Sequence, residues 1–278
     1  MGLKTTLRTL LDPEKRLRNS LLNRRRVCNQ RRPFPLTPEG ILRGVDREKL
    51  ESIRVRQGVY DPAARADKYL MDVDKWLGTN IERVLSLGLD LKSGKRVLDL
   101  GAGPGYFLHI CKLLGHDVLG LDMLEPINVW YADMFELFSM PQRVIWRIDP
   151  FVPLPGLGPR FDYVCSFMVC FNRHLEECVW KVEEWRFFLD DLWTHLKPGA
   201  VVWFQLNPGV GGAHYTPDLQ AFFESRGAIV DGKHLVWGMD ELQYRLLLHL
   251  AKKETAAIRA GHLNSRQTPS TLVQSSRP

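Results

Sequence analysis

The 278-residue sequence contains no apolar run that approaches the roughly 20 residues needed to cross a lipid bilayer. It also lacks a short apolar segment with a cleavage site behind its first charged residues. A membrane-spanning protein and a secreted protein are therefore not expected. The sequence predicts a cytoplasmic protein, and contact with the periphery of a membrane surface stays an open alternative.

Cysteine is also scarce. The sequence has five cysteines and no Cys-x-x-Cys pair. An odd number does not suit a disulfide framework, and thiolate zinc sites use closely spaced pairs. We therefore expect no metal site, and we expect the cysteines to be small buried apolar residues, namely Cys28, Cys111, Cys165, Cys170 and Cys178.

Acidic residues are rare at the start of the chain. Residues 1–32 hold ten Lys or Arg and two acids, a net charge of +8, whereas the whole chain carries +6 and the remainder therefore −2. Leucines among these arginines predict one or two short basic helices, interrupted at Asp12-Pro13 and followed by an extended linker. Such an arm could bind an anionic membrane surface, nucleic acid or the protein's own body, and these alternatives remain open.

Behind the arm, the apolar residues of 62–91 recur at helical spacing, and short apolar runs then alternate with helical patterns. This alternation is typical of βαβ units and a parallel sheet. The predicted strands are 96–100, 117–121, 144–148, 163–167, 200–206, 228–230 and 235–237. The expected fold is a doubly wound α/β fold with a mostly parallel, seven-stranded, Rossmann-like sheet and a helical N-terminal extension.

Helices are predicted between these strands. One begins at Tyr106, one at Pro126, one ends at the turn 197–199, and one is capped by Thr216. A last helix from Asp240 is expected to fade into a polar tail. The predicted organisation is a basic arm and linker at 1–35, a helical extension at 36–91, the main α/β domain at 92–262 and a disordered tail at 263–278.

A glycine-rich turn joins the first predicted strand to its helix. Gly101, Gly103 and Gly105 let the backbone approach a ligand closely and direct the helix N-terminus at it. The dinucleotide fingerprint G-x-G-x-x-G places its last glycine where this chain has Tyr106. A bulky ring there disfavours a pyrophosphate site, and with it a nicotinamide-dependent oxidoreductase.

Asp99 lies inside the apolar strand that precedes this turn. An ionised carboxylate is costly in such surroundings unless a cation or a hydrogen-bond donor meets it. A ligand that carries an ammonium group would meet that need. The turn therefore favours a ligand with a cationic end and no pyrophosphate.

Residues 97–107, Val-Leu-Asp-Leu-Gly-Ala-Gly-Pro-Gly-Tyr-Phe, resemble the first motif of class I S-adenosylmethionine-dependent methyltransferases. Asp122 is similar to the family acid that binds the ribose hydroxyls, and Asp149 to the acid that contacts the adenine amino group. The segments 161–164 and 196–200 are similar to the fourth-strand motif and to the turn before strand five. The resemblance implies S-adenosyl-L-methionine as cofactor, bound by Asp99, Gly101, Ala102, Gly103, Gly105, Asp122, Met123, Asp149, Phe151, Phe167 and Met168.

The methyl acceptor is less constrained. An oxygen acceptor often needs a general base, and His174 and His214 follow the fourth and fifth predicted strands, where such a base must lie. Each could instead make a structural loop contact. Arg173 could hold an anionic acceptor or lie free at the surface. Tyr60 and Tyr69 resemble, in position only, aromatic residues that close over the cofactor in some family members.

The Asn/Asp-Pro-Pro-Tyr/Phe signature of methylases that act on amino groups is absent, because residues 167–170 read Phe-Met-Val-Cys. This absence disfavours exocyclic amines of nucleic acids as targets. The leading hypothesis is transfer to oxygen of a small-molecule or glycan acceptor. The alternatives are an RNA-directed methyltransferase or RNA-binding protein recruited by the arm, and a non-catalytic scaffold.

Overall fold

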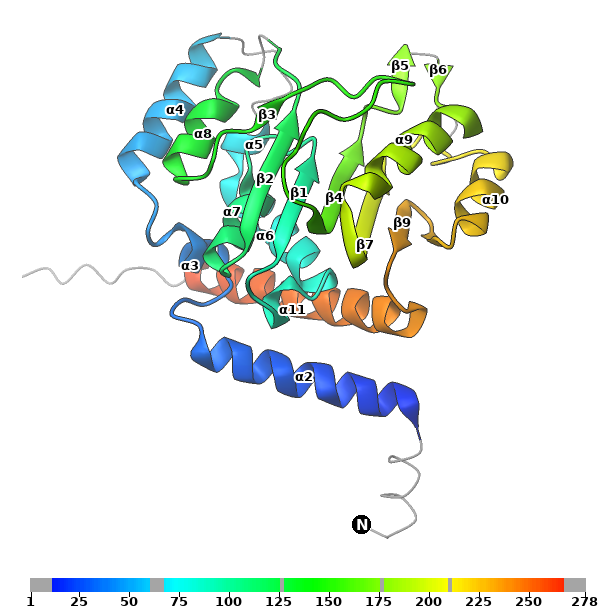
Figure 1. Ribbon diagram of the computed structural model, residues 1–278. Coiled ribbons are helices and arrows are strands. Elements are labelled where there is room, and N and C mark those ends of the chain that lie inside the picture. The colour runs from blue at the N-terminus through cyan, green and yellow to red at the C-terminus, as the bar shows by residue number, and fades with distance from the viewer. Residues whose placement is uncertain (1–11, 61–67, 126–127, 176–177, 210–211, 268–278) are drawn as a thin grey trace, which may run out of the picture.

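The computed structural model describes residues 12–60, 68–125, 128–175, 178–209 and 212–267. Within these ranges, no helix combines the length and the apolar character that crossing a bilayer requires. The described chain folds around one large sheet with helices on both faces (Figure 1).

The sheet has seven strands in the order β3-β2-β1-β4-β7-β9-β8. Neighbours from β3 to β7 are parallel, and β9 runs antiparallel to both β7 and β8. The strands are β1 (Arg96–Leu100), β2 (Asp117–Asp122), β3 (Val144–Ile145), β4 (Phe161–Val169), β7 (Leu196–Leu206), β8 (Ile229–Asp231) and β9 (His234–Trp237). The predicted doubly wound, mostly parallel seven-stranded sheet is confirmed.

Helices cover the sheet on two sides (Figure 1). One side carries α3 (Pro38–Leu42), α4 (Arg47–Tyr60), α6 (Val73–Ser86), α7 (Tyr106–Leu113), α8 (Tyr131–Leu137) and α11 (Glu241–Gln267). The other side carries α9 (Val182–Thr194) and α10 (Pro217–Ser225). Short elements complete the described chain: α5 (Lys68–Met71), the 3-10 helix η2 (Leu89–Leu91) and the hairpin β5 (Arg173–Leu175) and β6 (Cys178–Val179).

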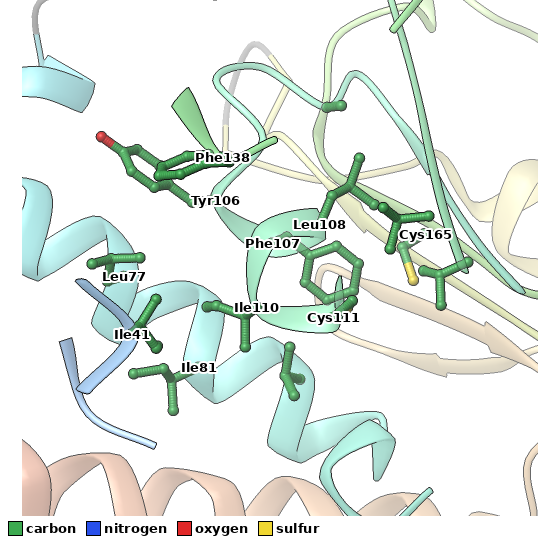
Figure 2. Packing of buried hydrophobic residues seen from close by; sticks show 14 of the residues in the cluster. Ile41, Leu77, Ile81, Tyr106, Phe107, Leu108, Ile110, Cys111, Phe138 and Cys165 are labelled. Carbon is green, nitrogen blue, oxygen red and sulfur yellow. The ribbon is translucent and has the colours of Figure 1, made fainter. Parts of the chain in front are cut away.

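Each face of the sheet has its own hydrophobic core. Successive side chains of β1 point to opposite faces, so Val97 joins the core under α6 and α7 while Leu98 and Leu100 join the core under α9 and α10. Figure 2 shows Ile110 of α7 pointing toward Ile81 of α6 in the first of these cores. This packing fixes α7, and therefore the turn before it, against the sheet.

Several local predictions differ from the structure. Strand β3 ends at Ile145 because, as an edge strand, it pairs only two residues with β2. The segment 197–200, expected as a turn, lies inside β7 as a bulge, because the pairing with β4 jumps from Leu196 to Val201. The hairpin of β5 and β6 was not predicted. The helix expected from Pro126 cannot be judged at its start, which lies outside the described residues, and α8 begins at Tyr131.

The basic arm packs on the body of the protein. Its described residues form the helix α2 (Pro13–Arg31), which Asp12 caps by accepting hydrogen bonds from two backbone N–H groups. Leu21 is buried against Leu247 and Leu250 of α11. At the other end of the chain, α11 continues to Gln267, into the segment predicted as a disordered tail.

Candidate functional site

The glycine turn lies at the carboxyl end of β1, where the chain order reverses between β2 on one side and β4 on the other. Ligands of open α/β sheets bind at such a switch point. Gly101, Gly103 and Gly105 all have positive φ angles, of 78°, 55° and 79°. A Cβ atom would meet nothing within 4 Å at Gly101 or Gly103, so the backbone there is open to a ligand. At Gly105 a Cβ atom would lie 2.6 Å from Met140. Close packing therefore favours glycine there, in addition to the positive φ.

Asp122 holds this turn at the end of β2. Its Oδ2 accepts a hydrogen bond from Gly103 N at 2.7 Å, and its Oδ1 accepts one from Met123 N at 2.9 Å. Burial raises the pKa of Asp122, and the two backbone donors oppose that rise. The carbonyl oxygen of Leu121 accepts further hydrogen bonds from Gly101 N and Ala102 N. The turn is thereby shaped before any ligand arrives.

Asp99 is buried beside the turn, with 3% of its surface exposed. Its Oδ1 has no hydrogen-bond partner among the described residues. Burial raises the pKa of Asp99 to about 8, although the nearby Arg83 guanidinium acts to lower it. An orphaned, buried carboxyl oxygen next to an open glycine backbone fits a ligand with an ammonium group, as the sequence predicted.

Arg83 is a further candidate for the site that the sequence did not predict. It lies on α6 and donates hydrogen bonds to Asn80 Oδ1 at 2.9 Å and to Gln205 Oε1 at 3.3 Å. Its guanidinium lies 4.3 Å from the centre of the Phe167 ring. Burial lowers the pKa of Arg83 to about 10, and Asp99 opposes this effect. An arginine inside the apolar repeat of α6 was the available signal.

The ends of the neighbouring strands bring apolar side chains to the same edge. Met168, at a pairing irregularity of β4, has a φ of 62° and is 44% exposed. Phe151, in the segment after β3, has a φ of 59° and is 56% exposed. Positive φ is strained for a side chain of either type, and such strain concentrates at functional sites. Met123 is exposed as well.

Asp149 lies in the segment between β3 and β4. This segment has no helix, and its Leu154 and Leu157 fill the core beside α9. Asp149 pairs with Arg147 at 3.0 Å, and both side chains are partly exposed. The structure thus places Asp149 after β3, as predicted, and leaves its role toward adenine a prediction.

Of the two candidate general bases, the structure describes the side chain of His214 but only the backbone of His174. The backbone of His174 belongs to β5, and its side chain lies outside the described part of the structure. His214 follows β7, is half-buried, and has a buried Nδ1 without a hydrogen-bond partner among the described residues. Its loop is tied to the end of β4, because Asn207 donates hydrogen bonds to the carbonyl oxygens of Met168 and Val169.

The aromatic residues near the turn are part of the packing. Tyr106 is buried against Phe138 (Figure 2). Its hydroxyl donates a hydrogen bond to the Tyr69 carbonyl oxygen at 2.9 Å. The Tyr69 ring packs on Trp76. The side chain of Tyr60 lies outside the described part of the structure. Arg173 donates a hydrogen bond to the Pro208 carbonyl oxygen.

A cavity lies at the opposite, amino-terminal edge of the sheet, between the starts of β1, β4 and β7. Its polar lining includes Lys92, Lys95, Asp162 and Gln243. It is remote in the fold from the glycine turn. Among the described residues, no three His, Cys, Asp or Glu side chains gather closely enough to hold a metal ion.

Solved structures of similar fold include three methyltransferases. One is magnesium protoporphyrin IX methyltransferase from Synechocystis PCC 6803 with bound S-adenosylmethionine (14% identity, 68% of this chain and 94% of that chain, TM-score 0.41). Another is ribosomal protein L11 methylase from Lactobacillus delbrueckii subsp. bulgaricus (14% identity, 57% and 76%, TM-score 0.37). A third is an S-adenosylmethionine-dependent methyltransferase from Clostridium acetobutylicum (15% identity, 61% and 54%, TM-score 0.35), of which this chain spans about half the length.

No curated protein matches the sequence significantly. A family model described as a methyltransferase domain matches residues 73–249, which is more than half of the chain and runs from the start of α6 into α11. The chain therefore belongs to the methyltransferase domain family, and the S-adenosylmethionine-dependent methyltransferase predicted from the turn at 99–105 is confirmed.

Proposed function

We propose that the protein transfers the methyl group of S-adenosylmethionine to an oxygen atom of a small-molecule or glycan acceptor, with His214 as general base. The observation that carries this proposal is the position of His214. It lies on the loop that follows β7, half-buried, with a buried Nδ1 that has no partner in the described structure. A neutral imidazole nitrogen without a hydrogen-bond partner can serve as a proton acceptor.

In this proposal, different residues at the carboxyl edge bind different parts of the cofactor. Asp99 would accept hydrogen bonds from the ammonium group, and Arg83 would face the carboxylate of the same amino-acid end. Asp122 would bind the ribose, and Asp149 with Phe151 and Met123 the adenine. When bound, the cofactor supplies a methyl group that is already activated by its sulfonium. The chain itself then needs to orient the acceptor and exclude water.

The exposed apolar residues support an acceptor with an apolar part. Met168 and Phe151 hold their side chains outward from strained backbone positions at the carboxyl edge. Such side chains can cover a bound molecule and keep water from the reacting atoms. His214 would take the proton that the acceptor hydroxyl loses. The absence of the Asn/Asp-Pro-Pro-Tyr/Phe signature at 167–170 disfavours exocyclic amines of nucleic acids as the target.

Cofactor binding is tested first, by thermal unfolding with and without S-adenosylmethionine. We expect saturating cofactor to stabilise the protein by about 3 kcal/mol at a hundredfold excess over its Kd. Asp122→Ala should abolish this stabilisation. An unchanged melting temperature of the wild-type protein at saturating cofactor would contradict the cofactor assignment.

Acceptor chemistry is tested with methyl-labelled cofactor and a panel of phenols, carboxylic acids, sugars, amines and thiols. We expect label in the oxygen acceptors, and we expect His214→Gln to lower kcat by about a hundredfold with unchanged cofactor binding. His249→Gln, a change at an exposed histidine of α11, is the matched control and should leave kcat unchanged. Label only in amines or thiols, or in none of the panel, would refute the proposal.

A further inference from the structure

The helix α2 buries one side and exposes the other. Leu17, Leu21 and Cys28 pack toward α11 and η2, and Arg25 is buried among them. Arg25 donates hydrogen bonds to both carboxyl oxygens of Asp90, at 2.7 and 3.2 Å. The apolar stripe of α2 is therefore already occupied by the protein itself.

The exposed side of α2 is rich in positive charge. Exposed cations extend along the whole helix, and Asn19, Asn23 and Gln30 lie between them; the cations are Lys15, Arg16, Arg18, Arg24, Arg26 and Arg31. Apart from Lys15, which pairs with Asp12, none of these cations forms an ion pair with a carboxylate of the described residues. The only acid inside the helix is Glu14, in its first turn.

The positive surface continues from α2 to the cavity at the amino-terminal edge of the sheet. Lys92 follows η2, which packs against α2. Burial lowers the pKa of Lys92, and the charges of Lys95 and Arg24 lower it further. Asp162 is held by Lys95 at 3.2 Å and by Lys197 at 2.6 Å. Lys95 is thus paired, whereas Lys92 and Arg24 are like charges close together, which favour an anionic partner.

The chemistry of this surface favours nucleic acid over a membrane. A helix that lies in a membrane surface inserts an apolar face, often with aromatic residues, and the apolar face of α2 is buried. Only Leu22 and Val27 are exposed apolar residues on α2. The helix also contains no aromatic residue that could stack on the bases of a single strand. The remaining kind of nucleic-acid contact is with the phosphates of a duplex. The length of α2, about 28 Å, is close to one turn of a DNA duplex, about 34 Å.

We infer that the exposed face of α2, continued by Lys92, binds the phosphate backbone of a nucleic-acid duplex. In Figure 1, α2 lies beyond α11 at the amino-terminal side of the strands, opposite the glycine turn. A duplex held there does not enter the methyl-transfer site. The surface is therefore a docking site that positions the protein, in addition to the proposed transfer to a small acceptor.

The test is fluorescence anisotropy with labelled DNA and RNA duplexes of about 20 base pairs, two helical turns, without cofactor. The variant Arg16→Gln/Arg24→Gln/Arg26→Gln removes three exposed charges and leaves Arg25 in place. The matched control, Arg43→Gln/Arg47→Gln/Arg160→Gln, removes three exposed charges from other surfaces. Melting temperatures of all three proteins verify that they fold alike.

We expect the wild-type protein and the control to bind a duplex and the α2 variant to bind at least about tenfold more weakly at 50 mM salt. The slope of log K against log salt concentration should fall in magnitude by about 2 to 3, since each lost phosphate contact removes about 0.9. Binding of only DNA or only RNA supports the inference and identifies the duplex. An equal loss in the control, no duplex binding by the wild type, or binding only to phosphatidylserine vesicles would overturn it.

Discussion

Two buried aspartates lie near opposite ends of β1 and differ in whether their carboxyl oxygens have partners. Asp90, just before β1, and Asp99, near its end, are each 3% exposed. Asp90 accepts two hydrogen bonds from Arg25, which also lies 3.4 Å from Glu254. Asp99 Oδ1 has no partner among the described residues. The two aspartates are therefore equally buried, but Asp90 has hydrogen-bond partners and Asp99 Oδ1 has none among the described residues.

The difference agrees with the proposed role of Asp99 toward the cofactor. Proteins satisfy nearly all buried polar groups, and an exception calls for an explanation. The carboxyl edge also holds the strained Met168 and Phe151, whereas the amino-terminal edge holds the ion pairs of Asp162 with Lys95 and Lys197. The carboxyl edge thus combines an orphaned carboxyl oxygen with strained backbone, an arrangement that agrees with the proposed cofactor site.

The largest expected effect comes from breaking the satisfied pair. Arg25→Ala leaves the Asp90 carboxylate buried without its cation, and we expect a loss of about 3 to 5 kcal/mol in the free energy of unfolding. Denaturation by urea measures the loss. Arg24→Ala removes an exposed charge next to it and should change stability by less than about 0.5 kcal/mol. Equal effects of the two variants would show that the pair is not structural.

Asp99→Asn should raise the free energy of unfolding, whereas Arg25→Ala lowers it. Because the folded-state pKa of Asp99 is raised to about 8, its contribution to stability is complete below pH 4 and is lost as the pH rises toward 8. We expect the variant to be more stable than the wild type at pH 8, by about 3 kcal/mol, and to lose affinity for S-adenosylmethionine. Urea denaturation from pH 4 to pH 9 and calorimetric titration provide the two readouts. Wild-type and variant curves that stay parallel over this range would contradict the orphaned state of Asp99.

A smaller loss of stability is expected from alanine substitutions at the glycines on either side of β1. Gly94 and Gly101 both have positive φ, of 64° and 78°, and a Cβ at either meets nothing within 4 Å. We expect Gly94→Ala and Gly101→Ala to lose similar stability, about 1 to 2 kcal/mol, because only the backbone conformation opposes the methyl group. Only Gly101→Ala should also weaken cofactor binding, by at least about tenfold. Equal cofactor affinity in both variants would place the cofactor elsewhere.

Much of the fold could be predicted because its signals are local. The β1 segment was predicted at its observed bounds, and the seven strands follow from apolar runs separated by helical patterns. The bounds of β3 and β7 could not be predicted, since they depend on pairing. An edge strand such as β3 ends where its neighbour stops accepting hydrogen bonds, and the bulge in β7 is visible only in its register with β4.

The site was predictable where it is contiguous in sequence. Asp99, Gly101 and Asp122 carry motif spacing, and the structure places them together at one edge. Arg83 could not be predicted, because its meaning depends on Gln205 and Phe167, which reach it only through the fold. The lack of a partner for His214 Nδ1 likewise depends on which residues surround its loop, and the sequence does not show which residues these are.

The contact of α2 with α11 joins the first helix of the described chain to the last. During synthesis, the leucines and Arg25 of α2 emerge before the sheet, while Leu247, Leu250 and Glu254 emerge only after all of its strands. Domains fold as their segments become available, and contacts between distant segments form late. The contacts of α2 with α11 can therefore form only after the last described helix has emerged, whereas its contacts with η2 are available earlier.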